Sequence, residues 1–74
     1  MKKYIFDYSK LLGKIKENSF TQEECAKLLG LSAQSFNYKI NNRRSFTQTE
    51  IVKLVNTLNI EVCAINEYFF TEKV

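Results

Sequence analysis

Residues 21–32 read TQEECAKLLGLS, a stretch that contains two helix starts separated by one helix stop. Thr21 and Glu24 have the spacing of a capping box, in which each side chain bonds the backbone amide of the other residue. Gly30 follows the apolar positions of this helix and is suited to a left-handed helix end. Ser32 is a favourable N-cap for the next helix. The stretch therefore predicts a short helix, a tight turn and a second helix.

The same residues have the spacing of a helix-turn-helix. Ala26 is small enough for two helices to approach closely, and Leu31 and Phe36 can anchor the second helix against the first. The opposite face of the second helix is then exposed and polar. We predict a helix-turn-helix over about residues 22–42, with a recognition helix from about Ser32 to Asn42.

Apolar residues at helical spacing predict further helices on both sides of this unit. We expect a helix capped by Asp7 that ends near Asn18, and another that starts at the capping box of Thr47 and Glu50. A short fifth helix should run from Val62 to about Glu67. The apolar positions expected to pack are Tyr8, Leu11, Leu12, Ile15, Ile51, Leu54, Val55, Leu58, Val62, Ile65 and Phe69.

The two ends of the chain leave a second possibility open. Tyr4-Ile5-Phe6 is rich in residues that favour strands, and Tyr68-Phe69-Phe70 fits an extended segment as well as a helix. The two ends could therefore pair as a short β ribbon beside the helices. The chain has 74 residues, no proline and two glycines, which favours one all-α domain of five helices.

Positive charge is concentrated in the first part of the chain. The net charge is +3, and residues 1–46 hold nine of the eleven basic residues but only four of the eight acidic ones. No acidic residue occurs between Leu31 and Phe46. A basic stripe over the second helix of a helix-turn-helix suits a polyanionic partner.

Several other functions find no support in the sequence. Histidine is absent, and we find no metal-ligand spacing, glycine-rich phosphate loop or carboxylate pair, so we expect no enzyme, cofactor, metal or small-molecule substrate. We also find neither a signal peptide nor a membrane-spanning stretch, and we expect a cytoplasmic protein. Cys25 and Cys63 are too few for a disulfide framework and are expected to be reduced core residues.

At this point the chain resembles a known family. Residues 21–32 are similar to the helix-turn-helix motif of the XRE/Cro-like repressors. Residues 6–15, the run Lys39-Ile40-Asn41 and the late Tyr68-Phe69-Phe70 resemble a group of small phage proteins described as Cro repressors. The resemblance implies a five-helix lambda-repressor-like domain that binds double-stranded operator DNA, often as a weak homodimer on a palindromic site.

Motif position then assigns roles to individual residues. Gln22 would hold a phosphate and brace the recognition helix, and Ala33 would meet only a thymine methyl group. The sequence departs from the family at two positions, since Lys39 stands in place of an apolar anchor and Asn42 stands where many relatives have glycine. The residues expected to read bases are Ala33, Gln34, Asn37 and Tyr38. Those expected to hold phosphates are Gln22, Ser35, Lys39, Asn42, Arg43 and Arg44.

Two functions from different classes fit these observations. The first is a sequence-specific DNA-binding transcriptional regulator, a phage Cro-like repressor that acts by occupying its operator. The second is a protein-interaction module, of the antirepressor or antitoxin kind, that uses the same fold without specific DNA binding. The aromatic tail would supply the protein-binding surface in that case, whereas an exposed part of the tail and Val52 are also candidates for a dimerisation patch. The exclusion of acids from the recognition face favours the first.

Overall fold

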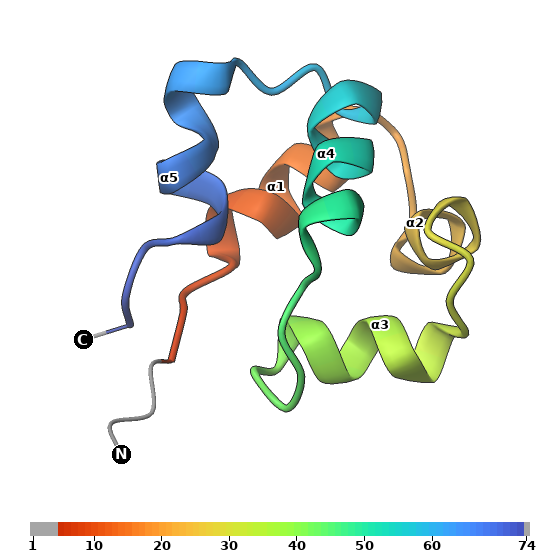
Figure 1. Ribbon diagram of the computed structural model, residues 1–74. Coiled ribbons are helices and arrows are strands. Elements are labelled where there is room, and N and C mark those ends of the chain that lie inside the picture. Colours follow the sequence, from red (N-terminus) through yellow and green to blue (C-terminus); the bar gives the residue numbers. More distant parts are fainter. Residues whose placement is uncertain (1–4, 74) are drawn as a thin grey trace.

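The structure is a computed structural model that describes residues 5–73, and it confirms an all-α fold of five helices (Figure 1). Helix α3 lies across the lower edge of the molecule in Figure 1, with α2 at one end and the loop to α4 at the other. No named strand occurs among the described residues. The helices are α1 (Ser9–Glu17), α2 (Gln22–Leu28), α3 (Ala33–Ile40), α4 (Gln48–Thr57) and α5 (Ile65–Phe69), with a 3₁₀ turn at Val62–Ala64 before α5.

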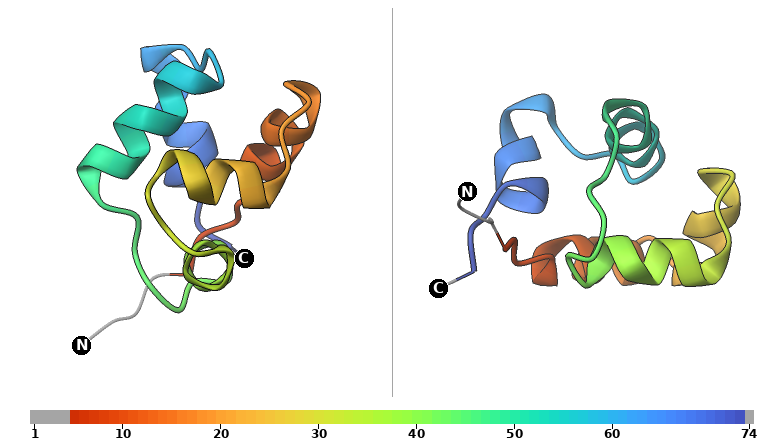
Figure 2. Two further views of the ribbon diagram at one scale, coloured as in Figure 1. Left: turned by 90° about the vertical axis from the view of Figure 1, so that its right-hand side faces the viewer. Right: turned by 60° about the horizontal axis from the view of Figure 1, so that its bottom comes forward.

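Helices α2 and α3 form the predicted helix-turn-helix. They cross at a steep angle, which Figure 2 shows with α3 seen end-on. Ala26 is buried where the two helices meet, and the Leu31 amide donates to the Ala26 carbonyl across 2.8 Å. The turn between the helices is therefore held by the backbone as well as by packing.

Both predicted capping boxes are present. At α2, the Glu24 amide donates to Thr21 Oγ1 and the Thr21 amide donates to Glu24 Oε1, at 3.1 and 2.9 Å. Thr47 and Glu50 repeat the arrangement at α4. The start of α1 differs from the prediction, because the N-cap position is Tyr8 rather than Asp7. The Asp7 carboxylate still accepts the Ser9 amide at 2.9 Å, so it satisfies one donor of the first turn.

Four helices end in the same way, although only the glycine was predicted. The second residue after each of α1 to α4 adopts a left-handed conformation, and the next amide reaches back to a carbonyl five residues earlier. This is a Schellman motif, which satisfies carbonyls that the helix leaves open. The left-handed residues are Ser19, Gly30, Asn42 and Asn59, with φ of 63°, 72°, 65° and 56°.

One core joins all five helices. Its largest fully buried side chains include Phe36 of α3, Leu11 of α1, Leu54 of α4 and Leu58, which directly follows α4. Three predictions are wrong here. Val62 is 81% exposed because it lies in the 3₁₀ turn and not on a core-facing helix, and the α5 helix continues to Phe69. Cys63 lies in the same turn and is exposed, whereas Cys25 is buried as expected.

The predicted ribbon between the chain ends is present as a single antiparallel bridge between Phe6 and Glu72. The Asp7 amide donates to the Thr71 carbonyl at 2.7 Å, and the Lys73 amide donates to the Ile5 carbonyl at 2.8 Å. The pairing falls after the aromatic run, because Tyr68 and Phe69 belong to α5. Tyr4, which was also expected in the ribbon, lies outside the described residues.

Candidate nucleic-acid interface

The outer face of α3 carries the side chains predicted to read bases. Ala33, Gln34 and Asn37 are exposed, while Phe36 on the opposite face is fully buried. Gln34 Nε2 donates to the Tyr38 hydroxyl at 2.8 Å, one helical turn away. A helix with one buried and one polar exposed face is the form in which helix-turn-helix proteins present side chains to a DNA groove.

Asn41 extends this face and was not singled out from the sequence. Its Nδ2 donates to the Asn37 carbonyl at 2.9 Å and to Asn37 Oδ1 at 3.2 Å. The spacing of four residues from Asn37 is the signal that could have identified it, because residues four apart lie next to each other on a helix. The exposed face thus consists of two side-chain pairs, Gln34 with Tyr38 and Asn37 with Asn41.

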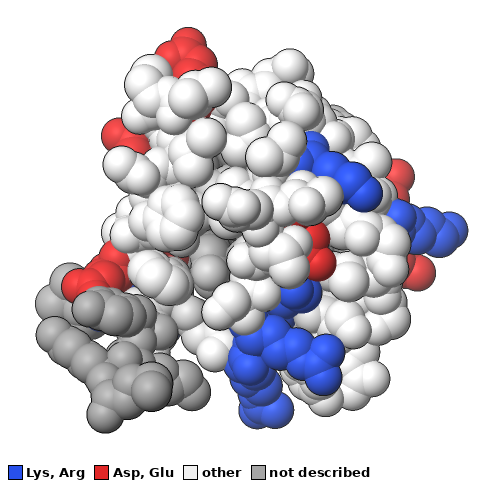
Figure 3. Space-filling model, in the orientation of Figure 1, with Lys and Arg blue, Asp and Glu red and all other residues white. Residues whose placement is uncertain are grey.

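A basic loop follows α3. Arg43 and Arg44 are exposed, and their guanidinium carbons lie 5.7 and 5.5 Å from the centroid of the Tyr38 ring. Neither arginine forms an ion pair within residues 5–73. Basic side chains gather at the lower edge of the molecule in Figure 3, where this loop lies. Tyr38 therefore belongs to the face of α3 and to the basic loop at once.

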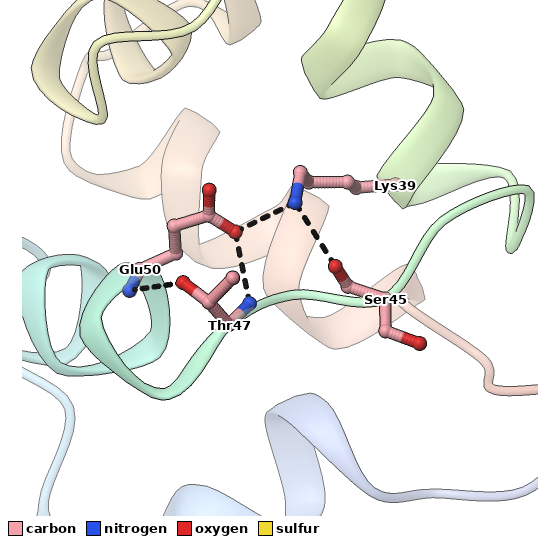
Figure 4. A network of polar contacts seen from close by, with 4 residues as sticks. All are labelled: Lys39, Ser45, Thr47 and Glu50. Carbon is pink, nitrogen blue, oxygen red and sulfur yellow. Dashed lines mark hydrogen bonds and ion pairs between the residues drawn. The ribbon is translucent and has the colours of Figure 1, made fainter.

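Lys39 does not belong to this surface, which corrects its predicted role as a phosphate contact. Its side chain points into the molecule, where Nζ donates to Glu50 Oε1 at 2.8 Å and to the Ser45 carbonyl at 2.9 Å (Figure 4). Lys39 and Phe36 are three residues apart and lie on the same inner face of α3. Lys39 thus occupies the position of an apolar anchor, with an ion pair in place of apolar contact.

Glu50 completes this network from α4. Burial raises the pKa of the Glu50 carboxyl. Hydrogen bonds from Lys39 and the Thr47 amide, together with the charge of Lys39, lower this pKa by more than burial raises it, so the pKa lies below its ordinary value. The same Oε1 atom that pairs with Lys39 accepts the Thr47 amide at 2.9 Å (Figure 4). Glu50 is therefore charged at neutral pH and joins the start of α4 to α3.

The side chain of Asn42 is held by contacts within the protein, which its predicted role as a phosphate contact did not anticipate. Oδ1 accepts the Phe6 amide at 2.8 Å, and Nδ2 donates to the Phe6 carbonyl at 2.9 Å. Its φ of 65° lies in the left-handed region that favours glycine. Asparagine is the other residue type that tolerates this conformation readily.

The last two predicted phosphate contacts lie at helix starts. Gln22 is the first residue of α2 and is exposed. Ser35 lies in the first turn of α3, where its Oγ accepts a hydrogen bond from Ser32 Oγ at 3.0 Å. Amides at a helix N-terminus attract anions. The phosphate roles of Gln22 and Ser35 stay predictions.

Comparison with known proteins gives one family match and one similar solved structure. Residues 4–72 match the model of a family described as a protein of unknown function (DUF739), and the chain belongs to this family. The fold is similar to the solution structure of the modulator of repression (MOR) of the temperate bacteriophage TP901-1 from Lactococcus lactis. The sequences are 40% identical, the match covers 88% of each chain, and the TM-score is 0.73. The chain is thus related to a phage regulatory protein.

Three further findings concern curated proteins, membrane-spanning helices and metal sites. The comparison with curated proteins gives no match. None of the helices within residues 5–73 has the length and apolar character needed to cross a bilayer. The described residues also contain no cluster of three or more side chains that could hold a metal ion.

Proposed function

We propose that this protein regulates phage transcription in a bacterial host cell by binding double-stranded DNA through α3 and the loop that follows it. The observation that supports the proposal is the placement of Arg43 and Arg44, two exposed cations with no acidic partner among residues 5–73, directly beside the polar face of α3. Two such cations at the end of an exposed helix suit contacts to the phosphates that border a groove.

The exposed side chains of α3 divide this work by their chemistry. Gln34 and Asn37 carry amides, which can pair with the donor and acceptor pattern of an adenine edge. Ala33 can contact only a thymine methyl group. Arg43 and Arg44 would add affinity that depends on salt and not on sequence. In this proposal the protein occupies an operator as a Cro-like repressor does.

A salt titration with variants of the loop tests this proposal. Binding to random duplex DNA and to the DNA beside its own gene is measured by fluorescence anisotropy for the native protein, Arg43→Gln and Arg44→Gln. Each substitution should make the slope of log Kd against log salt shallower by about 1. The matched control is Lys10→Gln, since Lys10 pairs with Glu67 of α5 on another side of the molecule. No saturable binding at low salt would refute the proposal.

A second candidate function is contact with a repressor protein. Val52 and Phe70 are 56% and 51% exposed, and together with Ile51 they line one hollow between α4 and the tail. Large apolar side chains grouped on a surface suit a protein partner. The related phage protein is described as a modulator of repression, and this description also suits contact with a repressor. In this reading the protein would change repression without reading DNA itself.

The two functions use different residues and can be separated. Binding to the repressor encoded in the same phage genome is measured by calorimetry for Val52→Ser, Phe70→Ser and the double variant Gln34→Ala/Asn37→Ala. If repressor contact is the function, the serine variants should weaken this binding and the double variant should not. If DNA binding is the function, the double variant should weaken binding to DNA and the serine variants should not. The exposure of all four side chains makes correct folding of the variants the expected result.

A further inference from the structure

The loop that carries Arg43 and Arg44 is held at both ends by side chains that form hydrogen bonds within the protein. At its far end, Lys39 Nζ donates to the Ser45 carbonyl at 2.9 Å. At its near end, the side-chain amide of Asn42 bonds the backbone amide and carbonyl of Phe6. The two arginines thus lie between two anchors that belong to the interior of the protein.

The anchor at Asn42 sets this helix end apart from the three similar ones. Ser19, Gly30 and Asn59 have the same left-handed conformation after α1, α2 and α4. Among the described residues, Asn42 is the only one of the four whose side chain bonds another segment of the chain. A glycine would serve the helix end equally well, so the helix end alone does not explain an amide at position 42.

Phe6 links this anchor to the paired ends of the chain. In an extended segment, neighbouring residues direct their amides and carbonyls to opposite sides. The Ile5 carbonyl and the Asp7 amide bond the C-terminal segment, and Phe6 turns both of its backbone groups toward Asn42. Asn42 therefore acts as a substitute for a third strand beside the Phe6–Glu72 bridge.

The next residue carries this link into the candidate interface. The Arg43 amide donates to the Tyr38 carbonyl at 2.8 Å, and the Arg43 guanidinium lies over the Tyr38 ring. We propose that Asn42 is a positioning residue, which couples the paired chain ends to the orientation of Arg43 and Arg44 beside Tyr38. The expected effect on DNA binding rests on the proposed function. The coupling itself rests on the contacts of Asn42 with Phe6.

Two glycine substitutions test the coupling. Asn42→Gly keeps the left-handed helix end and removes both bonds to Phe6. Asn59→Gly makes the same change after α4, where the Asn59 side chain bonds no other segment within residues 5–73. The first readout is NMR contact between the Tyr38 ring and the arginine side chains. We expect it to be lost in Asn42→Gly and kept in Asn59→Gly. Contact that persists unchanged in Asn42→Gly would overturn the proposal.

The second readout is DNA binding, which separates positioning from a general loss of stability. Asn42→Gly should weaken binding roughly tenfold, the size expected for losing a hydrogen bond to a charged group. It should also make the salt slope shallower by roughly 1 to 2, since each phosphate contact contributes about 0.9. Equal affinities and slopes in the two variants would also overturn the proposal. If the native protein binds no DNA, the proposed function fails, and the contact with Tyr38 decides the coupling alone.

Discussion

Lys39 of α3 and Glu50 of α4 form an ion pair in which Nζ lies 2.8 Å from Oε1 and the two side chains are only 9% and 12% exposed. The pair lies behind the candidate interface and joins α3 to the start of α4. Because Lys39 also bonds the Ser45 carbonyl, the loop between the two helices closes over the pair. The shape of the basic loop therefore depends on a buried ion pair.

Removing one member of this pair should destabilise the fold strongly. In Lys39→Met, the Glu50 carboxylate stays buried without its counter-charge, and we expect a loss of roughly 3 kcal/mol or more in the free energy of unfolding. Urea unfolding measures this change. Lys53→Met, an exposed lysine of α4, is the matched control and should change stability by less than about 0.5 kcal/mol. Equal effects of the two substitutions would contradict the structural role of Lys39.

The same pair should make stability fall in acid. The pKa of Glu50 is lower in the folded protein than its ordinary value of 4.5, so its contribution is complete above that pH. It is lost as the pH falls through the folded pKa, where protonation favours the unfolded chain. Unfolding free energies measured from neutral pH to below 4.5 should therefore drop less steeply in Glu50→Gln than in the native protein. Curves of equal steepness would argue against this assignment.

The two glycines should respond to alanine in opposite directions. A Cβ at Gly13 or at Gly30 meets nothing within 4 Å, so space is not the difference. Gly13 lies inside α1, where alanine should stabilise the helix by about 0.5–1 kcal/mol. Gly30 has a φ of 72°, a conformation that costs alanine roughly 1–2 kcal/mol. Thermal unfolding of both variants tests this, and a stabilising Gly30→Ala would contradict the left-handed turn.

The two cysteines should differ in reactivity. Burial raises the pKa of the Cys25 thiol, and the nearby Glu24 raises it further, so the thiolate that reacts is scarce as well as inaccessible. Cys63 is exposed. An aromatic disulfide reagent should modify Cys63 rapidly in the native protein and Cys25 only after denaturation. Cys63→Ser should abolish the fast phase, and a fast phase that remains would show that Cys25 is accessible.

The sequence predicted the features that depend on neighbouring residues. The capping boxes at Thr21 and Thr47 and the turn at Gly30 form within a few residues, so their spacing is sufficient evidence. The inward direction of Lys39 was missed, because its partner Glu50 is eleven residues away and a buried lysine is rare. The role of Asn42 was missed for the same reason, since its partner Phe6 is 36 residues away.

In the candidate interface too, some features followed from local sequence patterns and others did not. The exposure of Gln34 and Asn37 followed from the helical period, because Phe36 between them had to face the core. The stacking of Arg43 and Arg44 beside Tyr38 did not, because it requires the left-handed turn at Asn42 to bring the chain back over the helix. Three-dimensional contacts of this kind have no periodic signal in the chain.

The measurement that tests the central claim most directly is a ¹⁵N NMR titration of the native protein with duplex DNA from beside its own gene. The account predicts that the side-chain amide signals of Gln34 and Asn37 and the backbone amides of Arg43 and Arg44 shift most. Signals from Val52 and Phe70 should stay in place. Shifts confined to Val52, Phe70 and their neighbours, or no shifts at low salt, would contradict DNA binding through α3.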